Sequence, residues 1–472
     1  MKYTKSIISA VMTISLIAGI FSGCSDGSEN SIGGTAPLPD GQETSGTRVL
    51  VNESTSVENP DIPAETYADT YPSVTGSADS NPEDISQTVT KASEPVRTMY
   101  SVDQLTENNA YQTALLKEIA REKDNFVISP LSVKLALNMA SLGAGSETER
   151  ELLTLFGYNL RDTMIDESSM RISELDRRDG SITVNNSVWL SDKDDVKISS
   201  EYIEELSGIF KAELFERDLS GADIVNEFNG WVNENTNGLI PRMISQPFDE
   251  DARLLLVNTL YFNNKWQNQF DPENTGDIIF RGTNGESMTM GMHMKSDDIL
   301  YSEGDIFKSV YLPYTDNSRM KVYLPAEESE NITDTIARLS PAELSAALEM
   351  DYRPQNVDLL LPKFECEYGE SLRDTLMVLG ISEAFDPDLA DFSGMLDGDS
   401  EYPVYISDVI HASKIKCGEL GTEAAAATAV IAAAGAALPP EDQIYFTANR
   451  PFLYVIEAPS GEVLFMGVIS NF

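Results

Sequence analysis

The sequence predicts an α+β fold for a domain that runs from Met99 to Phe472. Helical patterns of apolar residues dominate the first half of this stretch, and strand patterns dominate the second half. The two kinds of pattern do not alternate regularly, as they would in a parallel α/β protein. Hydrophobic residues make up 41% of the 472-residue chain, which is enough for a sizeable core.

The N-terminal residues 1–24 have the features of a secretion signal. Lys2 and Lys5 precede an apolar run from Ile7 to Phe21, and small residues follow it. Because Cys24 comes directly after a glycine, the segment resembles a bacterial lipoprotein signal, in which the cysteine is lipidated and becomes the mature N-terminus. Phe21 departs from the leucine usual at its position, so ordinary secretion is the alternative. We expect a secreted protein, anchored to the bacterial cell surface by lipid at Cys24, with no other membrane contact.

Residues 25–98 differ from the rest of the chain in composition. They include 13 acidic and 3 basic residues, 7 prolines and many small polar residues, without a sustained hydrophobic period. Such a segment buries too little apolar surface to offset the entropy of ordering it, so we expect it to be disordered. As a flexible coil it would have an r.m.s. reach of roughly 50 Å and would act as an acidic tether for the domain.

The first half of the domain contains helices with recognisable ends. The expected elements are a helix around Leu115–Ile119, a strand at Phe126–Ile128, a helix at Leu131–Leu142, a helix around Leu152–Phe156, a strand at Ile182–Leu190 and a helix with Phe228 and Trp231. Ser129 and Pro130 fit an N-cap and a first helical position, and Gly143 ends the helix that they open. Ser146–Glu149 has the sequence of a capping box for the next helix.

Strands dominate the second half of the domain. We expect strands at Leu254–Phe262, Met320–Leu324 and Leu359–Phe364, a helix at Leu372–Leu379, and a final hairpin of Phe452–Ile456 and Val463–Ile469. The run Leu254–Phe262 is too continuously apolar for a half-exposed strand, so we expect it to be buried on both faces. Asn258 lies in its middle, where a buried amide needs hydrogen-bond partners.

The segment from Glu419 to Pro440 fits neither a core element nor an ordinary linker. Ten of the 14 residues from Ala424 to Ala437 are alanine, so propensity alone predicts a helix. Alanine on all sides offers no wide apolar stripe, however, and Gly435 weakens a helix further. The segment is too short and too weakly hydrophobic to span a membrane. We therefore expect an exposed loop of small residues.

Composition limits both the chemistry and the partners of the protein. Its 77 acidic and 33 basic residues give a net charge of −44, which argues against nucleic acids and polyanions as partners and favours cationic ones. A surface that is acidic only for solubility is the alternative. Three cysteines and two histidines, His293 and His411, show no zinc-binding spacing, and no phosphate loop or nucleophile elbow is present. We expect no metal, no cofactor and no enzymatic activity.

Six motifs follow one another along the domain. They are Asn125–Ser132; Asn258–Trp266 with Phe270–Pro272; Ala390–Met395 with Ile406, Ser407 and His411; Glu419–Thr428; Arg450–Tyr454; and Leu464–Gly467. In this order and over this length they resemble the serpin family across essentially all of Met99–Phe472. The resemblance implies three β-sheets, eight or nine helices and an exposed reactive-centre loop.

The resemblance also implies a mechanism and a monomeric inhibitor of serine proteases. The loop is offered to the protease as a substrate, and after cleavage its N-terminal part inserts as a new central strand into the largest sheet. The acylated protease is carried along and its active site is distorted, so the inhibitor acts once, as a suicide substrate.

The loop hinge of this family matches Gly421, Thr422, Glu423, Ala424, Ala425, Ala426, Ala427 and Thr428. Gly421 gives the pivot its backbone freedom. Thr422 enters the sheet first, and because side chains alternate along a strand, Thr422, Ala424, Ala426 and Thr428 should face the core and Glu423 the solvent. Leu420 stands where the family usually has an acidic residue, but it precedes the pivot and should not block insertion.

Further residues match the family's polar cluster beneath the main sheet: Ser129, Ser132, Asn258 and His411. A hydrogen-bonded network that can rearrange suits a sheet that stays closed and later opens. A satisfied core histidine is the plain alternative for His411. Trp266 matches the tryptophan near the point of insertion, with core packing as its alternative.

The position of the scissile bond depends on the point from which the loop residues are counted. Counting from the hinge gives Gly435–Ala436, which we favour, and counting from Pro439–Pro440 gives Ala436–Ala437. A small residue before the cut suits the shallow pocket of elastase-like or subtilisin-like serine proteases. The acidic surface would speed the encounter with a cationic protease. The alternatives are an inhibitor of a cysteine protease, a non-inhibitory binding protein of the same fold, and a protease-sensitive linker in an adhesin.

Cys366 and Cys417 lie on strands that the family places side by side. If Lys363 opposes Glu419, the two thiols point to opposite faces of the sheet, so we expect no disulfide. His293 lies in a methionine-rich strand, where we expect a surface or packing role.

Overall fold

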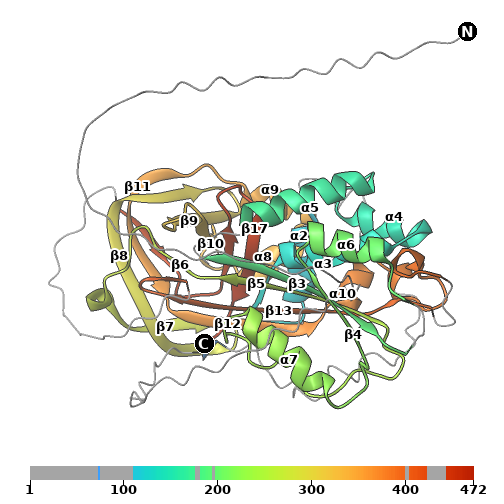
Figure 1. Ribbon diagram of the computed structural model, residues 1–472. Coiled ribbons are helices and arrows are strands. Elements are labelled where there is room, and N and C mark those ends of the chain that lie inside the picture. The colour runs from blue at the N-terminus through green and yellow to red at the C-terminus, as the bar shows by residue number, and fades with distance from the viewer. Residues whose placement is uncertain (1–72, 75–109, 176–180, 194–196, 399–402, 423–442) are drawn as a thin grey trace, which may run out of the picture. The chain divides into compact units, whose positions relative to one another are not determined.

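The structure is a computed structural model (Figure 1) that describes residues 73–74, 110–175, 181–193, 197–398, 403–422 and 443–472. Every described residue belongs to one compact unit of the chain. Cys24, the hinge from Glu423 onward and both candidate scissile bonds lie outside the described residues. No helix among the described residues is long and apolar enough to cross a membrane.

Nine α-helices lie in the described residues, and six of them come before residue 240. They are α2 (Ala110–Ala120), α3 (Pro130–Gly143), α4 (Ser146–Leu155), α5 (Arg161–Leu175), α6 (Ser200–Ile209), α7 (Ile224–Asn235), α8 (Ile332–Arg338), α9 (Pro341–Leu348) and α10 (Arg373–Val378). The short 3-10 helices are η3 (Pro272–Asn274), η4 (Glu383–Phe385) and η5 (Ser393–Met395). In Figure 1, α3, α4, α5 and α6 gather toward one end of this unit, and β7, β8 and β11 lie toward the other.

The first sheet has eight strands. In spatial order they are β1 (Ser73–Val74), β12 (Phe364–Ser371), β13 (Ile406–Gly418), β5 (Leu254–Phe262), β3 (Ile182–Ser191) and β4 (Glu213–Arg217), with the short strands β14 (Gly421–Thr422) and β6 (Asn264–Lys265) beside the end of β13. The central strands β13 and β5 are parallel to each other. A two-residue piece of the predicted acidic tether, β1, pairs in parallel with the edge of β12.

The second sheet has nine strands. Their order is β15 (Ile444–Thr447), β11 (Arg353–Pro362), β8 (Gly285–Glu303), β9 (Phe307–Pro313), β10 (Arg319–Pro325), β16 (Phe452–Glu457), β17 (Val463–Ile469) and β2 (Phe126–Ile128), and β7 (Thr275–Gly282) also pairs with β8. The 19-residue β8 pairs with β7 near its start and with β9 near its end. By hydrogen bonding the described strands therefore form two sheets, where the resemblance implied three.

Burial of β5 on both faces is confirmed. Leu254 and Leu256 point into the main core, whereas Leu255 and Val257 pack in a second core that α7 covers. Alternating side chains of one strand thus serve two cores, which explains why its sequence is continuously apolar.

Two local predictions are wrong. Ser146 does not cap α4: Gly145 occupies the N-cap position, and the Ser146 hydroxyl donates to the Asp391 carboxylate at 2.7 Å. The run Leu359–Phe364 is not one strand, because the chain leaves the second sheet at Pro362 and enters the first at Phe364.

Candidate functional site

The last described residues before the alanine-rich segment already belong to the first sheet. Gly421 and Thr422 form β14, which pairs with β13 on one side and with β6 on the other. Since β6 follows β5 along the chain, β14 lies between the ends of the two central strands. A Cβ atom at Gly421 would lie 2.0 Å from the Asn264 carbonyl oxygen, so only glycine permits this close backbone approach.

The Thr422 side chain is buried, with 1% of its surface exposed. Its hydroxyl shares a hydrogen bond of 2.6 Å with the hydroxyl of Tyr314. The Tyr314 ring stacks on Trp266, with centroids 4.4 Å apart and planes 14° apart. Trp266 donates its indole N–H to the carbonyl of Gly418 at 2.8 Å. Thr422 and Trp266 were predicted from the sequence, whereas Tyr314, which connects them, was not.

The turn between β13 and β14 is held from two further directions. The backbone N–H groups of Trp266 and Phe270 donate to the carbonyls of Leu420 (2.9 Å) and Glu419 (3.0 Å), respectively. The Glu419 carboxylate forms an ion pair with Lys363 at 3.0 Å, and both side chains are mostly buried. Five side chains thus surround the β13–β14 turn: Trp266, Tyr314, Lys363, Glu419 and Thr422.

The expected polar cluster forms two adjacent hydrogen-bonded groups. In the first, His411 Nε2 accepts from the Ser129 backbone N–H (3.0 Å) and from the Ser413 hydroxyl (2.8 Å). The Ser129 hydroxyl in turn accepts from the Ser132 backbone N–H at 3.1 Å and so caps α3. Since Nε2 only accepts, Nδ1 carries the proton of the neutral ring.

Asn258 belongs to the second group. It is the cross-strand partner of His411, but its side-chain amide donates to Asn186 of β3. Asn186 then donates to the Phe210 carbonyl at 2.8 Å. Among the described residues, the Asn258 side-chain oxygen has no hydrogen-bond partner. Sequence patterns gave no signal for Asn186 or Ser413.

Burial determines the protonation of two groups under this sheet. It lowers the pKa of His411 to about 3, so the imidazole is neutral at neutral pH. Burial raises the pKa of Asp408 on the same strand to about 6. Hydrogen bonds from the Ser371 hydroxyl and the Val409 N–H act in the opposite direction, because they stabilise the carboxylate.

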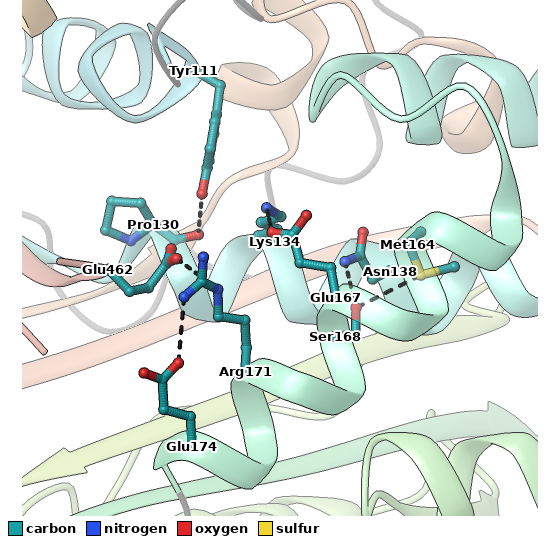
Figure 2. A network of polar contacts seen from close by, with 10 residues as sticks. All are labelled: Tyr111, Pro130, Lys134, Asn138, Met164, Glu167, Ser168, Arg171, Glu174 and Glu462. Carbon is teal, nitrogen blue, oxygen red and sulfur yellow. Dashed lines mark hydrogen bonds and ion pairs between the residues drawn. The ribbon is translucent and has the colours of Figure 1, made fainter. Parts of the chain in front are cut away.

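Helix α3 forms the fixed base beneath the cluster, because polar contacts tie it to α2 and to its partner helix α5, and tie α5 to Glu462 just before β17 (Figure 2). The contacts are Tyr111 hydroxyl to Pro130 carbonyl (3.4 Å), Lys134 to Glu167 (2.7 Å), Asn138 to Ser168 (2.9 Å), and Arg171 to Glu462 (3.1 Å) and Glu174 (3.4 Å). Lys134 also lies over the Tyr158 ring, 5.1 Å from its centroid. These contacts fix Ser129 and Ser132 relative to the helical end of the unit.

Cys366 and Cys417 are both free and buried, but the reason given for the missing disulfide is wrong. Phe364 opposes Cys417 and Cys366 opposes Ile415, so the thiols are diagonal neighbours on the same face. Lys363 and Glu419 form an ion pair without being register partners, because their long side chains reach across the offset.

His293 is partly exposed on β8 and forms a contact with Asp358 of β11, in agreement with the surface role expected for it. In the part of the chain that the structure describes, no three His, Cys, Asp or Glu side chains are arranged to hold a metal ion.

Comparisons with known proteins agree on one family. The model of the family described as "Serpin (serine protease inhibitor)" matches residues 106–472. An uncharacterized serpin-like protein of Thermococcus kodakarensis is 31% identical over 380 residues, which cover 77% of this chain and 84% of that protein. Human glia-derived nexin is 28% identical over 392 residues, or 79% of this chain and 94% of the relative.

Solved structures extend the agreement to the fold. The thermophilic serpin tengpin in its native state superposes with a TM-score of 0.70 at 27% identity, covering 80% of this chain and 97% of that one. Native protease nexin-1 with heparin superposes with a TM-score of 0.65 at 25% identity, covering 79% and 100%.

Proposed function

The chain belongs to the serpin family, and from this premise we propose that it inhibits serine endopeptidases of elastase-like or subtilisin-like specificity as a suicide substrate. Serpins are protease inhibitors rather than enzymes, and the family's target proteases are the partners to consider first. After cleavage of the reactive loop, the hinge enters the first sheet between β13 and β5 and carries the acyl-enzyme with it.

The observation that carries this proposal is β14. Gly421 and Thr422 already pair with strands on both sides, at the end of the β13–β5 pair that would have to part for an inserting strand. If the following residues continued this strand, alanine and threonine would occupy its alternate, core-facing positions 424, 426 and 428. Such side chains add little volume between β13 and β5, so insertion meets no steric or desolvation barrier from a large or charged group.

The polar groups under the sheet suit its opening. Separating β13 from β5 breaks the backbone ladder that joins His411 and Asn258 as cross-strand partners. The hydrogen bonds of His411 go to Ser129 and Ser413, and that of Asn258 goes to Asn186. Neither side-chain group bridges the opening strands, so each keeps its partners while the strands part.

The target specificity follows from the loop sequence. We propose Gly435–Ala436 as the scissile bond, with Ala436–Ala437 as the alternative. A glycine or alanine before the bond fits a shallow specificity pocket and offers nothing to a trypsin-like or chymotrypsin-like one. The net charge of −44 would accelerate the approach of a cationic protease. Secretion with a lipid anchor at Cys24 would place the inhibitor at the cell surface, where it meets external proteases.

Incubation with pancreatic elastase and, separately, with subtilisin tests the proposal. We expect a covalent complex that survives SDS, loss of protease activity, and release of a C-terminal fragment that begins at Ala436 or Ala437. N-terminal sequencing of this fragment decides between the two bonds.

Two other outcomes would replace the proposal. Clean cleavage of the loop while the protease stays active would mean a non-inhibitory binding protein of the same fold. Inhibition of a papain-like cysteine protease without inhibition of either serine protease would move the target to that class. A parallel melting curve of the cleaved chain adds an independent check, because an inserted loop should raise Tm strongly.

A further inference from the structure

An exposed aromatic side chain lies just beyond the alanine-rich segment. Tyr445 on β15 is 56% exposed, although most large apolar and aromatic side chains of the described residues are buried. Its strand is the edge strand of the second sheet and begins at Ile444, one residue after the described chain resumes at Gln443. The other face of β15 is core, since Phe446 is fully buried. Tyr445 therefore exposes its ring on a strand whose opposite face is packed in the core.

Polar contacts organise the surface beside this ring. Tyr445, Asp358 and Lys295 form one row across β15, β11 and β8, because Asp358 is the register partner of both other residues. Gln443 accepts from Lys295 Nζ (2.7 Å) and donates to Asp358 Oδ2 (2.9 Å). His293 contacts the other oxygen of the same carboxylate. We call Tyr445, Gln443, Asp358, Lys295 and His293 the β15 platform.

The platform differs in charge from the chain as a whole. The chain carries −44, but the one carboxylate of the platform is bonded to His293 and Gln443, and Lys295 contributes a positive charge. The side chains of Gln443, Asp358, Lys295 and His293 are held by one another, so they lose little freedom on contact with a partner. An exposed tyrosine ring beside such a pre-organised polar surface is typical of residues that contribute strongly to protein–protein interfaces.

The proposed scissile bond is separated from this surface by only a short stretch of chain. From Ala436 to Gln443 there are seven residues, which span at most about 25 Å even when fully extended. A serine protease of about 240 residues has a radius of gyration of about 18 Å, so its body extends roughly 23 Å from its centre. From Glu423 to Gly435 the chain has 12 residues and reaches up to about 43 Å. Residues 436–443 are therefore the shorter of the two connections, and they keep a protease bound at the scissile bond close to β15.

We propose that the β15 platform is a second docking surface for the target protease, which it contacts on the rim that flanks the binding sites for residues after the scissile bond. This rests on the proposed inhibitory function and adds to it a contact outside the loop. The Tyr445 ring stacks on an apolar or guanidinium side chain of that rim, while Lys295 and Gln443 offer hydrogen-bond donors beside it. The contact forms in the encounter complex, before cleavage, and so increases the rate of association.

The test compares second-order association rate constants with pancreatic elastase for the full chain and three variants. We expect Tyr445→Ala to lower the rate constant about fivefold, as loss of one well-placed aromatic anchor does, and Tyr445→Phe to keep it within a factor of about two because the ring remains. Leu389→Ala is the matched control: Leu389 is 59% exposed and lies between η4 and η5, where η4 packs on α4. It should leave the rate unchanged.

Two further measurements separate this inference from the proposed function. The number of inhibitor molecules consumed per protease inactivated should be the same for the wild type and Tyr445→Ala, because insertion does not involve the platform. The fold-difference between them should persist at 0.5 M NaCl, since the ring carries no charge, although both rates fall with salt. If the wild type forms no covalent complex, the inhibitory function fails. If it does, and Tyr445→Ala associates as fast as Leu389→Ala, the platform alone is overturned.

Discussion

The hydroxyl groups of Thr422 and Tyr314 lie 2.6 Å apart and share a buried hydrogen bond, although the two residues are 108 positions apart in the chain. Tyr314 in turn stacks on Trp266, whose indole N–H bonds to the carbonyl just before the hinge turn. The first core-facing side chain of the proposed hinge, Thr422, is therefore already buried in the first sheet with a specific partner. Insertion of the remaining hinge would extend an existing strand and would not have to start one.

Thr422→Arg should convert the inhibitor into a substrate. The side chain at this position is fully enclosed, and a guanidinium there would be buried without a partner, so the strand would not seat between β13 and β6. We expect the number of inhibitor molecules consumed per protease inactivated to rise at least about fivefold, with the excess recovered as cleaved chain. Glu423→Arg is the control, because the alternation of a strand directs that position to solvent. Unchanged consumption in Thr422→Arg would contradict the role of β14.

Tyr314→Phe should loosen the hinge without removing the aromatic stack. Phenylalanine keeps the ring on Trp266, but it leaves the Thr422 hydroxyl buried and without its partner, which costs about 1–2 kcal/mol. We expect Tm of the uncleaved chain to fall by roughly 2 °C, measured by differential scanning fluorimetry. The exposed Tyr445→Phe serves as the control and should melt as the wild type does. A Tm for Tyr314→Phe equal to that of the control would mean that the hydrogen bond contributes nothing.

Most residues of the candidate site could be predicted from the sequence, and the residues that could not be predicted share one property. Thr422, Trp266, Ser129, Ser132 and His411 stand in local motifs, so a single sequence was enough to identify them. Tyr314, Asn186 and Ser413 act through partners distant in the chain or through strand pairing, and no local pattern carries that information.

The fold shows the same division. Apolar runs with clear ends predicted β5, α3 and the final hairpin, and these elements are buried on nearly all sides. The register of β12 against β13 was predicted one residue off, because Lys363 was placed opposite Glu419, whereas Phe364 opposes Cys417. Long charged side chains satisfy each other across such an offset, whereas the packing of Phe364 and Cys417 in the core sets the true register.

The Lys363–Glu419 ion pair should be measurably coupled. Both side chains are mostly buried, at 14% and 10% exposure, so removing one leaves the other charged and poorly solvated. In a double-mutant cycle with Lys363→Met and Glu419→Gln, we expect each single change to destabilise the uncleaved chain and the pair to show a coupling energy of about 1–3 kcal/mol. Equilibrium or kinetic unfolding in urea provides the measurement. Additive effects of the two changes would show that the ion pair does not hold the hinge turn.

Acid should weaken the first sheet through His411. Its pKa is lowered to about 3 in the folded protein by burial and returns to about 6.5 on unfolding, so the unfolded state binds the extra proton between these values. Stability from this group is complete above about pH 6.5 and is lost progressively as the pH falls toward 3. We expect the Tm advantage of the wild type over His411→Gln to shrink between pH 7 and pH 4. A constant difference over this range would contradict the buried neutral imidazole.

Asp408 on the same strand should show the opposite dependence. Burial raises its pKa from 3.8 to about 6, so between these values the folded state binds the proton and stability falls as the pH rises. Asparagine resembles the protonated carboxyl in shape and does not titrate, and it can keep accepting from the Ser371 hydroxyl. Asp408→Asn should therefore gain Tm relative to the wild type as the pH rises from 4 to 7, where the wild type must bury a charge. Because the two groups act in opposite directions between about pH 4 and 6, the wild type itself should show only a shallow pH profile there. Relative to the wild type, the Tm of His411→Gln should fall as the pH rises, whereas the Tm of Asp408→Asn should rise. If both differences changed in the same direction, at least one of the two buried protonation states would be ruled out.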